Sequence, residues 1–246
     1  MLLNSTKKVV LVSGSTRGIG KAIADRFLTD NYFVIQNSRN AQFDLNLPSD
    51  NYIKADVTDF NDCKEMIERI HQDFGKLDVL VSNVGSGKKL TSSLDVPKRW
   101  NSYIHSNLLS TTYLVEAALP LLIKSKGNVV AISSICGSSQ ITDAPIEYSV
   151  SKAALNMYIK SMAYRYGALN VRFNVVAPGN VLFKGSVWQD KLQNQKEIVE
   201  EYISQNVPMK AFITPKDVAE AVAFLASENA IHTTGVILNV DAGQDL

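Results

Sequence analysis

The chain has 246 residues, of which 46% are hydrophobic, which suits the core of one α/β domain better than two ordinary domains. The 25 basic and 24 acidic residues leave a net charge of +1, so the composition favours neither nucleic acid nor a membrane surface as a partner. Two cysteines and three scattered histidines lack the spacing of metal ligands, so we expect no metal site.

The N-terminus, MLLNSTKKVVLV, contains polar residues and two lysines where a signal peptide would have an apolar core. No segment approaches about 18 consecutive apolar residues, so we expect no membrane-spanning helix. Together with the reduced thiols expected of the two cysteines, these features predict a cytoplasmic protein.

Apolar runs alternate with segments of helical periodicity along the whole chain. Most of the runs are continuous rather than alternating, as in a parallel sheet that helices cover on both faces. The sequence therefore predicts a single α/β domain over residues 1–246, a doubly wound (Rossmann-type) sheet of about seven strands. We expect strands at 8–13, 32–36, 52–55, 77–82, 128–133, 171–175 and 235–240, and helices at 19–27, 60–74, 98–124, 148–166, 189–205 and 215–226.

The first predicted strand runs into a glycine-rich loop, G-x-x-x-G-x-G, from Gly14 to Gly20. Glycines let the backbone turn tightly and approach a pyrophosphate, and the helix that follows offers free N–H groups and a positive dipole. Its place between a strand and a helix favours a dinucleotide site over an ordinary glycine turn.

The end of the second predicted strand indicates which dinucleotide binds. An acidic residue there would favour NAD, but residues 36–39 read QNSR and contain no carboxylate. Ser38, Arg39 and Arg17 could instead surround a 2′-phosphate, because guanidinium groups bind phosphate bidentately. We therefore predict NADP (NADPH) as the cofactor; the alternative is that both arginines are merely solvated.

Tyr148 and Lys152, in the sequence YSVSK, lie four residues apart and so share one face of a predicted helix. A free tyrosine has a pKa of about 10, and a nearby ammonium that lowers this pKa would make the phenol a general acid/base at neutral pH. The pair alone is weak support, because nine tyrosines make one such spacing by chance about as probable as not.

Further markers accompany this pair, and with them the chain resembles the short-chain dehydrogenase/reductase family, in its short form, over residues 7–245. Each marker follows the family's order and falls at a strand end or on the expected helix. They are the glycine loop 14–20, Asp56, Asn83-Val84-Gly85, Asn107, Ser134, Tyr148 with Lys152, Pro178-Gly179 and Val240-Asp241-Ala242-Gly243.

The resemblance implies catalytic roles for four residues. Tyr148 would exchange a proton with the substrate oxygen during hydride transfer, and Ser134 would hydrogen-bond that oxygen. Lys152 would lower the pKa of the tyrosine and hold the nicotinamide ribose. Asn107 would bind a proton-relay water through its backbone carbonyl, at a kink in the long helix.

The resemblance also implies a set of cofactor contacts and an assembly. The long helices near 100–123 and 150–166 commonly join four subunits in this family, so we expect a homotetramer. The pyrophosphate and adenosine ribose would be held by Gly14, Arg17, Gly18, Ile19 and Gly20, and the 2′-phosphate by Ser38 and Arg39. Asp56 and Val57 would flank the adenine, and Asn83 and Gly85 would lie near the central strand. The nicotinamide would be held by Pro178, Gly179 and Val181, beside Tyr148 and Lys152.

Three positions depart from the family pattern. Ser134 lies 14 residues before Tyr148, one more than the commonest spacing, so Ser133 is an alternative to it. Val84 is larger than the usual alanine. Phe183 stands where the family often has a threonine that meets the carboxamide, which leaves that contact to backbone groups at Val181 or makes Phe183 part of a substrate lid.

We expect that lid at about 181–209. It contains two aromatic residues, Phe183 and Trp188, and two cations, Lys184 and Lys191. These side chains could form a pocket with apolar walls and a cation for an anionic substrate group. The alternative is an amphipathic helix that packs over the sheet.

The resemblance implies an NADPH-dependent reductase of a ketone or aldehyde, nearest to the 3-oxoacyl-acyl-carrier-protein reductases in the segments SGSTRGIG and RFNVVAPG. Residues 166–170 lack the basic residue that such enzymes commonly use to dock the acidic carrier. An alternative substrate is therefore a sugar or other polar metabolite, as in surface-glycan synthesis.

Two other classes fit less well. A non-catalytic NADP-binding regulator would not need the intact serine, tyrosine, lysine and asparagine. An extended-form nucleotide-sugar epimerase or dehydratase would need a longer C-terminal domain and a different glycine spacing.

Overall fold

The structure is a computed structural model, and it describes residues 6–40, 51–90 and 95–245. Residues 1–5, which belong to the segment considered for a signal peptide, lie outside the described residues. A seven-stranded, wholly parallel sheet forms the centre, in the order β3-β2-β1-β4-β5-β6-β7. Its strands are β1 (Val9–Val12), β2 (Phe33–Ser38), β3 (Tyr52–Lys54), β4 (Val79–Ser82), β5 (Asn128–Ile132), β6 (Arg172–Pro178) and β7 (Ile237–Val240).

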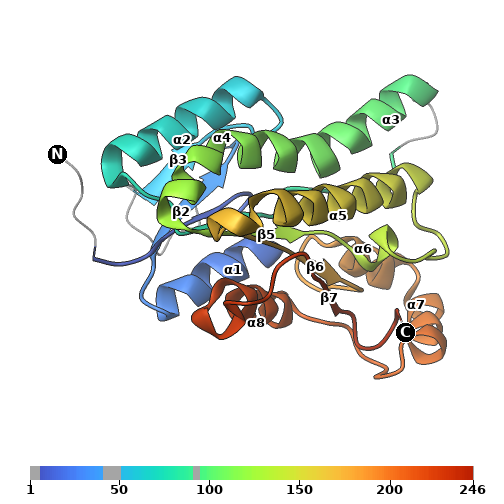
Figure 1. The fold of residues 1–246 in the computed structure, drawn as a ribbon. Helices are drawn as coiled ribbons and strands as arrows, with labels where there is room; N and C mark the ends of the chain where they lie inside the picture. The colour runs from blue at the N-terminus through green and yellow to red at the C-terminus, as the bar shows by residue number, and fades with distance from the viewer. Residues whose placement is uncertain (1–5, 41–50, 91–94, 246) are drawn as a thin grey trace.

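Helices cover both faces of this sheet (Figure 1). In β1, Val9 and Leu11 face one helical layer, whereas Val10 and Val12 face the other, which explains why the strand reads as a continuous apolar run. The helices on one face are α2 (Phe60–Phe74), α4 (Ser110–Ser125) and α5 (Ile146–Tyr166); those on the other face are α1 (Gly18–Thr29) and α8 (Pro215–Ala226).

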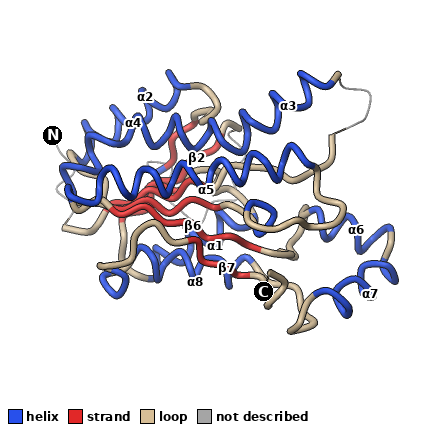
Figure 2. Tube along the Cα trace, turned by 45° about the vertical axis from the view of Figure 1, so that its right-hand side comes forward, coloured by secondary structure: helices blue, strands red, loops and turns tan. Residues whose placement is uncertain are grey.

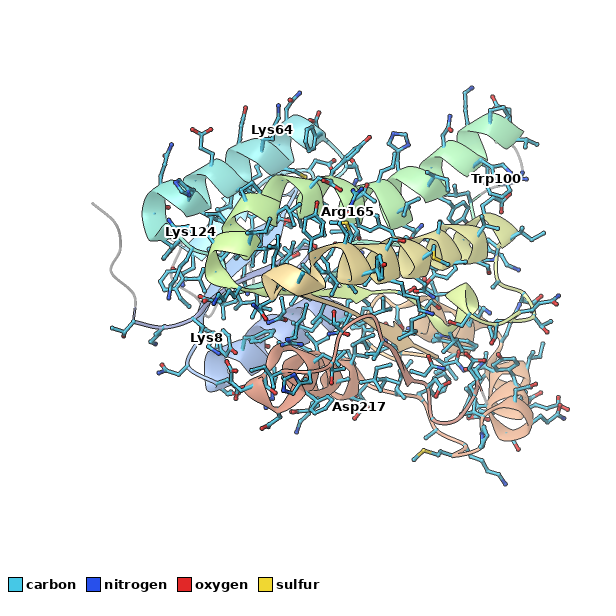
Figure 3. The ribbon with its side chains drawn as sticks, in the orientation of Figure 1. Lys8, Lys64, Trp100, Lys124, Arg165 and Asp217 are labelled. Atoms are coloured by element: carbon cyan, nitrogen blue, oxygen red, sulfur yellow. The ribbon has the colours of Figure 1, made fainter. Side chains whose placement is uncertain are left out.

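The described residues form three further α-helices. The helix α3 (Val96–Ile104) precedes α4, and α6 (Val187–Asn194) and α7 (Lys196–Asn206) lie beyond one end of the sheet, on the side of the C-terminus (Figure 2). Side chains fill the space between the sheet and the helices (Figure 3). The predicted single doubly wound domain with seven parallel strands is confirmed.

Two helix predictions need correction. The predicted helix 189–205 is two helices, because the backbone leaves helical geometry at Gln195 (φ −147°, ψ 49°), which ends α6 and precedes α7. The predicted helix 98–124 extends from Val96 to Ser125 but contains a π-helical turn, His105–Leu109.

The stretch Val96–Ser125 also bears on membrane insertion. It is the one helix of the described residues that is long and apolar enough to cross a membrane, with a mean hydropathy of 1.2 in its most apolar 18-residue window, half of which is buried inside the protein. A count of uninterrupted apolar residues misses it, because polar residues separate the apolar ones. It meets this criterion by length and composition alone, as a helix packed in a protein core also can, so the expectation of no membrane-spanning helix stays a prediction.

Candidate active site

The glycine loop folds tightly at the start of α1. Gly14 and Gly18 have φ values of +61° and +55°, and a Cβ atom on Gly20 would lie 2.2 Å from the Gly14 carbonyl oxygen. No side-chain hydrogen bond from the described residues caps α1 at Arg17, and its first turn contains no acidic residue. The backbone N–H groups at this helix end are thus available to a pyrophosphate, and the loop fits a dinucleotide.

A cleft of about 950 Å³ extends from this loop along the carboxyl ends of the central strands to α5. Phe183 and Gly185, from the segment after β6, also line it. The predicted site residues that line the cleft are Gly14, Arg17, Ile19, Gly20, Ser38, Arg39, Asp56, Val57, Asn83, Gly85, Tyr148 and Lys152; those that do not are Gly18, Asn107, Ser134, Pro178, Gly179 and Val181.

Two arginines stand at the adenosine end of the cleft. Arg17 and Arg39 both line it, and neither forms an ion pair with another described residue. The Ser38 hydroxyl is already engaged, because it donates to the Asn40 carbonyl at 2.7 Å and lies 2.8 Å from the Tyr52 hydroxyl. Both guanidinium groups are thus open to an anion, whereas Ser38 keeps only acceptor capacity.

Asp56 lies beside Arg39. Burial alone would raise the pKa of Asp56, but hydrogen bonds from the Thr58 backbone and hydroxyl and the charge of Arg39 hold it below its usual value. The carboxylate is therefore ionised, and part of the Arg39 charge is balanced from this side of the cleft.

Asn37, a residue that sequence reasoning missed, also shapes the adenosine end. Its side chain is fully buried, and its Nδ2 atom donates to the carbonyls of Ile53 and Ala55 at 3.1 Å each. These two hydrogen bonds connect the end of β2 to the end of β3. The only available signal was a polar residue inside an otherwise apolar strand.

Asn83 serves the sheet in the same way. Its backbone N–H donates to the Ser13 hydroxyl at 3.0 Å, and its Nδ2 atom donates to the carbonyls of Ser13 and Gly14 at 3.1 Å each. These bonds join the end of β4 to the glycine loop, so the shape of the loop depends on this amide.

Tyr148 and Lys152 meet at the opposite end of the cleft. The Lys152 Nζ atom donates to the Ile132 carbonyl at 2.9 Å and lies 6.0 Å from the centre of the Tyr148 ring. A Cβ atom on Gly85 would lie 3.0 Å from that Nζ atom, and one on Gly87 would lie 3.3 Å from the tyrosine Cζ atom. Residues after β4 therefore pack closely against both side chains.

The pKa values of this pair differ from the simple expectation. Burial raises the pKa of Tyr148, and a hydrogen bond with the Ser134 hydroxyl only partly opposes it. Burial also lowers the pKa of Lys152 to about 8. The expectation that the lysine lowers the tyrosine pKa does not hold in this structure, because burial dominates and the ammonium is directed to the Ile132 carbonyl.

The hydrogen bond to Tyr148 also separates the two candidate serines. Ser134 makes it, and its hydroxyl in addition accepts from the Cys136 backbone N–H at 3.2 Å. The hydroxyl of Ser133 instead donates to the Lys152 carbonyl at 3.4 Å. Ser134 is thus the serine that contacts the phenol, despite the extra residue in the intervening loop.

Asn107 is fully buried in the π-helical turn. Its Oδ1 atom accepts from the Ser86 N–H at 2.8 Å, and its Nδ2 atom donates to the carbonyls of Ser86 and Tyr103 at 3.2 and 3.0 Å. The long helix is therefore irregular at the predicted kink, and the asparagine fixes the loop after β4.

The segment after β6 lies over the glycine loop. Val181 forms a parallel bridge with Ile213, and the Phe183 ring packs so closely on Gly18 that a Cβ atom there would lie 2.5 Å from it. Pro178 ends β6, and the Gly179 N–H donates to the Val240 carbonyl at 2.9 Å. Phe183 thus covers the phosphate end of the cleft rather than the end that holds Tyr148.

Two of the residues of the expected lid, Trp188 and Lys191, contact each other. Trp188 stacks on Tyr202 with ring centres 5.5 Å apart, and the Lys191 Nζ atom lies 4.6 Å from the Trp188 ring centre. Neither Trp188 nor Lys191 lines the cleft. In the part of the chain that the structure describes, no three His, Cys, Asp or Glu side chains gather closely enough to hold a metal ion.

Replacing Lys152 with methionine is expected to stabilise the cofactor-free protein by about 1–3 kcal/mol at pH 7, because a buried ammonium is costly. The lysine pKa falls from 10.5 to about 8 on folding, so the unfolded chain binds more protons between these values and wild-type stability rises with pH across them. The gain should shrink between pH 8 and 10.5, as measured by urea denaturation. Lys160→Met, on the exposed face of the same helix, is the control. If Lys152→Met stabilised the protein equally at pH 8 and at pH 10.5, burial of the ammonium would be excluded as the cause.

Known proteins resemble the chain over almost its whole length. The family model described as enoyl-(acyl carrier protein) reductase matches residues 14–245. Glucose 1-dehydrogenase 2 of Bacillus subtilis is 32% identical, covering 100% of this chain and 98% of its own. The 3-oxoacyl-[acyl-carrier-protein] reductase FabG of Haemophilus influenzae is 33% identical, covering 96% and 97%. The solved structure of ElxO with NADP bound is 32% identical and superposes with a TM-score of 0.87, covering 97% and 99%.

Proposed function

Because the chain belongs to the short-chain dehydrogenase/reductase family of oxidoreductases, we propose that it interconverts a ketone or aldehyde and an alcohol with NADP(H). The observation that carries this proposal is the position of Tyr148 and the buried Lys152, whose Nζ atom lies 6.0 Å from the tyrosine ring centre, at the far end of a cleft that begins at the glycine loop. Its lining includes the glycine loop at one end and Tyr148 at the other, so a phosphate and a reacting carbonyl would lie at opposite ends.

The cofactor would supply or accept the hydride, and residues of the cleft would hold it. Gly14, Gly18, Gly20 and Ile19 would face its pyrophosphate. Asp56 and Val57 would lie at the adenine, Asn83 and Gly85 near the riboses, and Pro178, Gly179 and Val181 at the nicotinamide. The last three, and Gly18, do not line the cleft now, so their contacts require the segment after β6 to shift.

In the proposed mechanism, the Tyr148 phenol donates its proton to the substrate oxygen when that oxygen gains negative charge. The Ser134 hydroxyl donates a hydrogen bond to the same oxygen and stabilises the charge. Lys152, with a pKa of about 8, exchanges protons readily near neutral pH and can restore the phenol. The backbone carbonyl of Asn107 would hold the water that links Lys152 to solvent. Oxidation of an alcohol reverses these steps.

We propose NADP rather than NAD because Arg17 and Arg39 line the adenosine end of the cleft and no carboxylate occupies the end of β2. Arg39→Ala is expected to raise KM for NADPH about tenfold or more and leave KM for NADH unchanged, since only the former carries the 2′-phosphate. Steady-state kinetics with both cofactors measures this. Arg69→Ala, in an exposed ion pair on α2, is the control. An unchanged ratio of the two KM values would reject the phosphate contact.

For the substrate, we propose a sugar or another polar metabolite ahead of an acyl thioester. One relative is named a glucose dehydrogenase and another an acyl-carrier-protein reductase, so both classes are represented among similar proteins. The stretch 166–170, which is exposed from Gly167 onward, offers no cation to an acidic carrier. The choice between the two classes therefore rests on this missing carrier contact.

A substrate screen tests the proposal. NADPH consumption would be followed with keto sugars, acetoacetyl thioesters and cyclic ketones, and NADP reduction with aldohexoses. We expect the highest kcat/KM with a hydroxylated carbonyl compound or its alcohol. Higher kcat/KM with the thioester would favour the reductase of acyl carriers, and NADPH binding without any turnover would favour a non-catalytic regulator.

We propose residues 181–209 as the substrate lid. Val199, Ile203 and Val207 of this segment form a small core of their own, apart from the two cores that line the sheet. The helices α6 and α7 can therefore shift together without disrupting the sheet.

We also propose a cytoplasmic homotetramer. The helix α5 exposes Ile146, Met157 and Tyr164 by 71, 63 and 94%, which suits burial against another subunit. A solution mass of one or two chains by light scattering would reject the tetramer.

A further inference from the structure

An ion pair fixes the residue that immediately precedes Tyr148. The Arg99 Nε atom, from α3, donates to the Glu147 Oε1 atom at 2.5 Å. Glu147 is only 7% exposed, and this hydrogen bond, with that of its own backbone N–H, holds its pKa below the usual value. A buried, ionised carboxylate thus lies in the first turn of α5 and depends on one arginine for its partner.

Among the described residues, no side chain caps the first turn of α5. Its N-cap residue, Pro145, makes no side-chain hydrogen bond within the described residues and has no side-chain donor or acceptor. Among those residues, the Arg99–Glu147 ion pair is also the only one that joins α3 to α5, which pack side by side. The position of this turn, and hence of Tyr148, therefore depends on a contact from a different helix.

Residues further along the same helix also bind the loop that packs against the Tyr148 phenol. Tyr103 lies one turn after Arg99, and its hydroxyl donates to the Lys88 carbonyl at 2.8 Å and accepts from the Leu90 N–H at 3.3 Å. The loop that it holds includes Gly87, where an added Cβ atom would lie 3.3 Å from the Tyr148 Cζ atom. Asn107, one further turn on, binds Ser86 in this loop.

One stripe along this helix thus contains Arg99, Tyr103 and Asn107, at four-residue spacing. Figure 3 labels Trp100, the neighbour of Arg99 on α3. The two later residues fix the loop against which the phenol packs, and the first fixes the turn from which the phenol extends. The stripe therefore fixes both the loop and the helical turn that determine the position of the Tyr148 hydroxyl relative to Ser134.

We propose that Arg99 is a positioning residue for proton transfer: through Glu147 it holds the first turn of α5 so that the Tyr148 phenol meets the substrate oxygen. This proposal rests on the proposed function, because it assumes that Tyr148 is the proton donor. Small displacements of such a group are costly, since a shift of about 1 Å can lower a rate a hundredfold.

The test compares Arg99→Gln, Glu147→Gln and the double variant in kcat, together with the Kd for NADPH from fluorescence titration. Arg99→Gln is expected to lower kcat about tenfold and leave the Kd within twofold, because the cofactor cleft does not include Arg99. The double variant should lose less than the product of the single losses, since the two residues act as one contact. Arg99→Lys should recover part of the loss, and Arg69→Gln, in the exposed pair on α2, should lose nothing.

Hydrogen exchange gives a readout that needs no turnover. Arg99→Gln should speed amide exchange in residues 147–151 and leave α2 unchanged. Unchanged exchange in that turn, a kcat within twofold of wild type, or independent effects of the two substitutions would each overturn the proposal. An inactive wild type in the substrate screen would instead overturn the proposed function, and the positioning role of Arg99 with it.

Discussion

Tyr148→Phe is expected to lower kcat by at least about a hundredfold while NADPH still binds with its wild-type affinity. The change removes only the hydroxyl, so the ring still packs against Gly87 and the cleft keeps its shape. The proton donor and its hydrogen bond to Ser134 are both lost. Because burial raises the pKa of this phenol, it is protonated at neutral pH and ready to donate, which makes its loss most severe in the direction of carbonyl reduction.

Steady-state kinetics and a fluorescence titration with NADPH measure the two effects separately. Tyr158→Phe is the matched control, because Tyr158 lies on the same helix but its hydroxyl bonds to Glu116, at 3.2 Å, outside the cleft. We expect its kcat to stay near that of wild type. If Tyr148→Phe lost tenfold or less, the phenol would have no part in the chemistry.

The parallel sheet and its covering helices were predictable from the sequence because local patterns mark most of the strands and helices. Buried strands read as apolar runs, and the helices between them have helical periodicity. The order of the strands was not predicted and comes from the structure. The polar markers then fall at the carboxyl ends of strands, which meet at one edge of the sheet. This is why the glycine loop, Asp56, Asn83 and Tyr148 line a single cleft.

The remaining features depend on contacts between residues far apart in the chain. The spacing of Tyr148 and Lys152 indicates their proximity, but the depth of burial that controls their pKa values comes from β4, β5 and the loops around them. The packing of Phe183 on Gly18 joins residues 165 positions apart. The ion pair of Arg99 with Glu147 joins two helices and has no local pattern.

Gly20→Ala is expected to weaken NADPH binding at least about a hundredfold and to lower Tm by several degrees. In an exposed helix this substitution would favour folding by about 1 kcal/mol, because alanine is the better helix former. Here the added Cβ atom would lie 2.2 Å from the Gly14 carbonyl oxygen and 2.5 Å from the Asn83 Nδ2 atom. Both neighbours are fixed, one by the backbone and the other by its bonds to Ser13 and Gly14, so the loop itself must open.

Gly167→Ala is the control, because an added Cβ atom there meets nothing within 4 Å and the residue is exposed at the end of α5. It should leave NADPH binding unchanged and alter stability by no more than about 1 kcal/mol, in the stabilising direction. Calorimetric Tm values and NADPH titrations of both variants provide the comparison. Wild-type affinity in Gly20→Ala would mean that the loop can open without loss of the phosphate site. The close approach of Gly20 to Gly14 would then serve helix packing rather than phosphate binding.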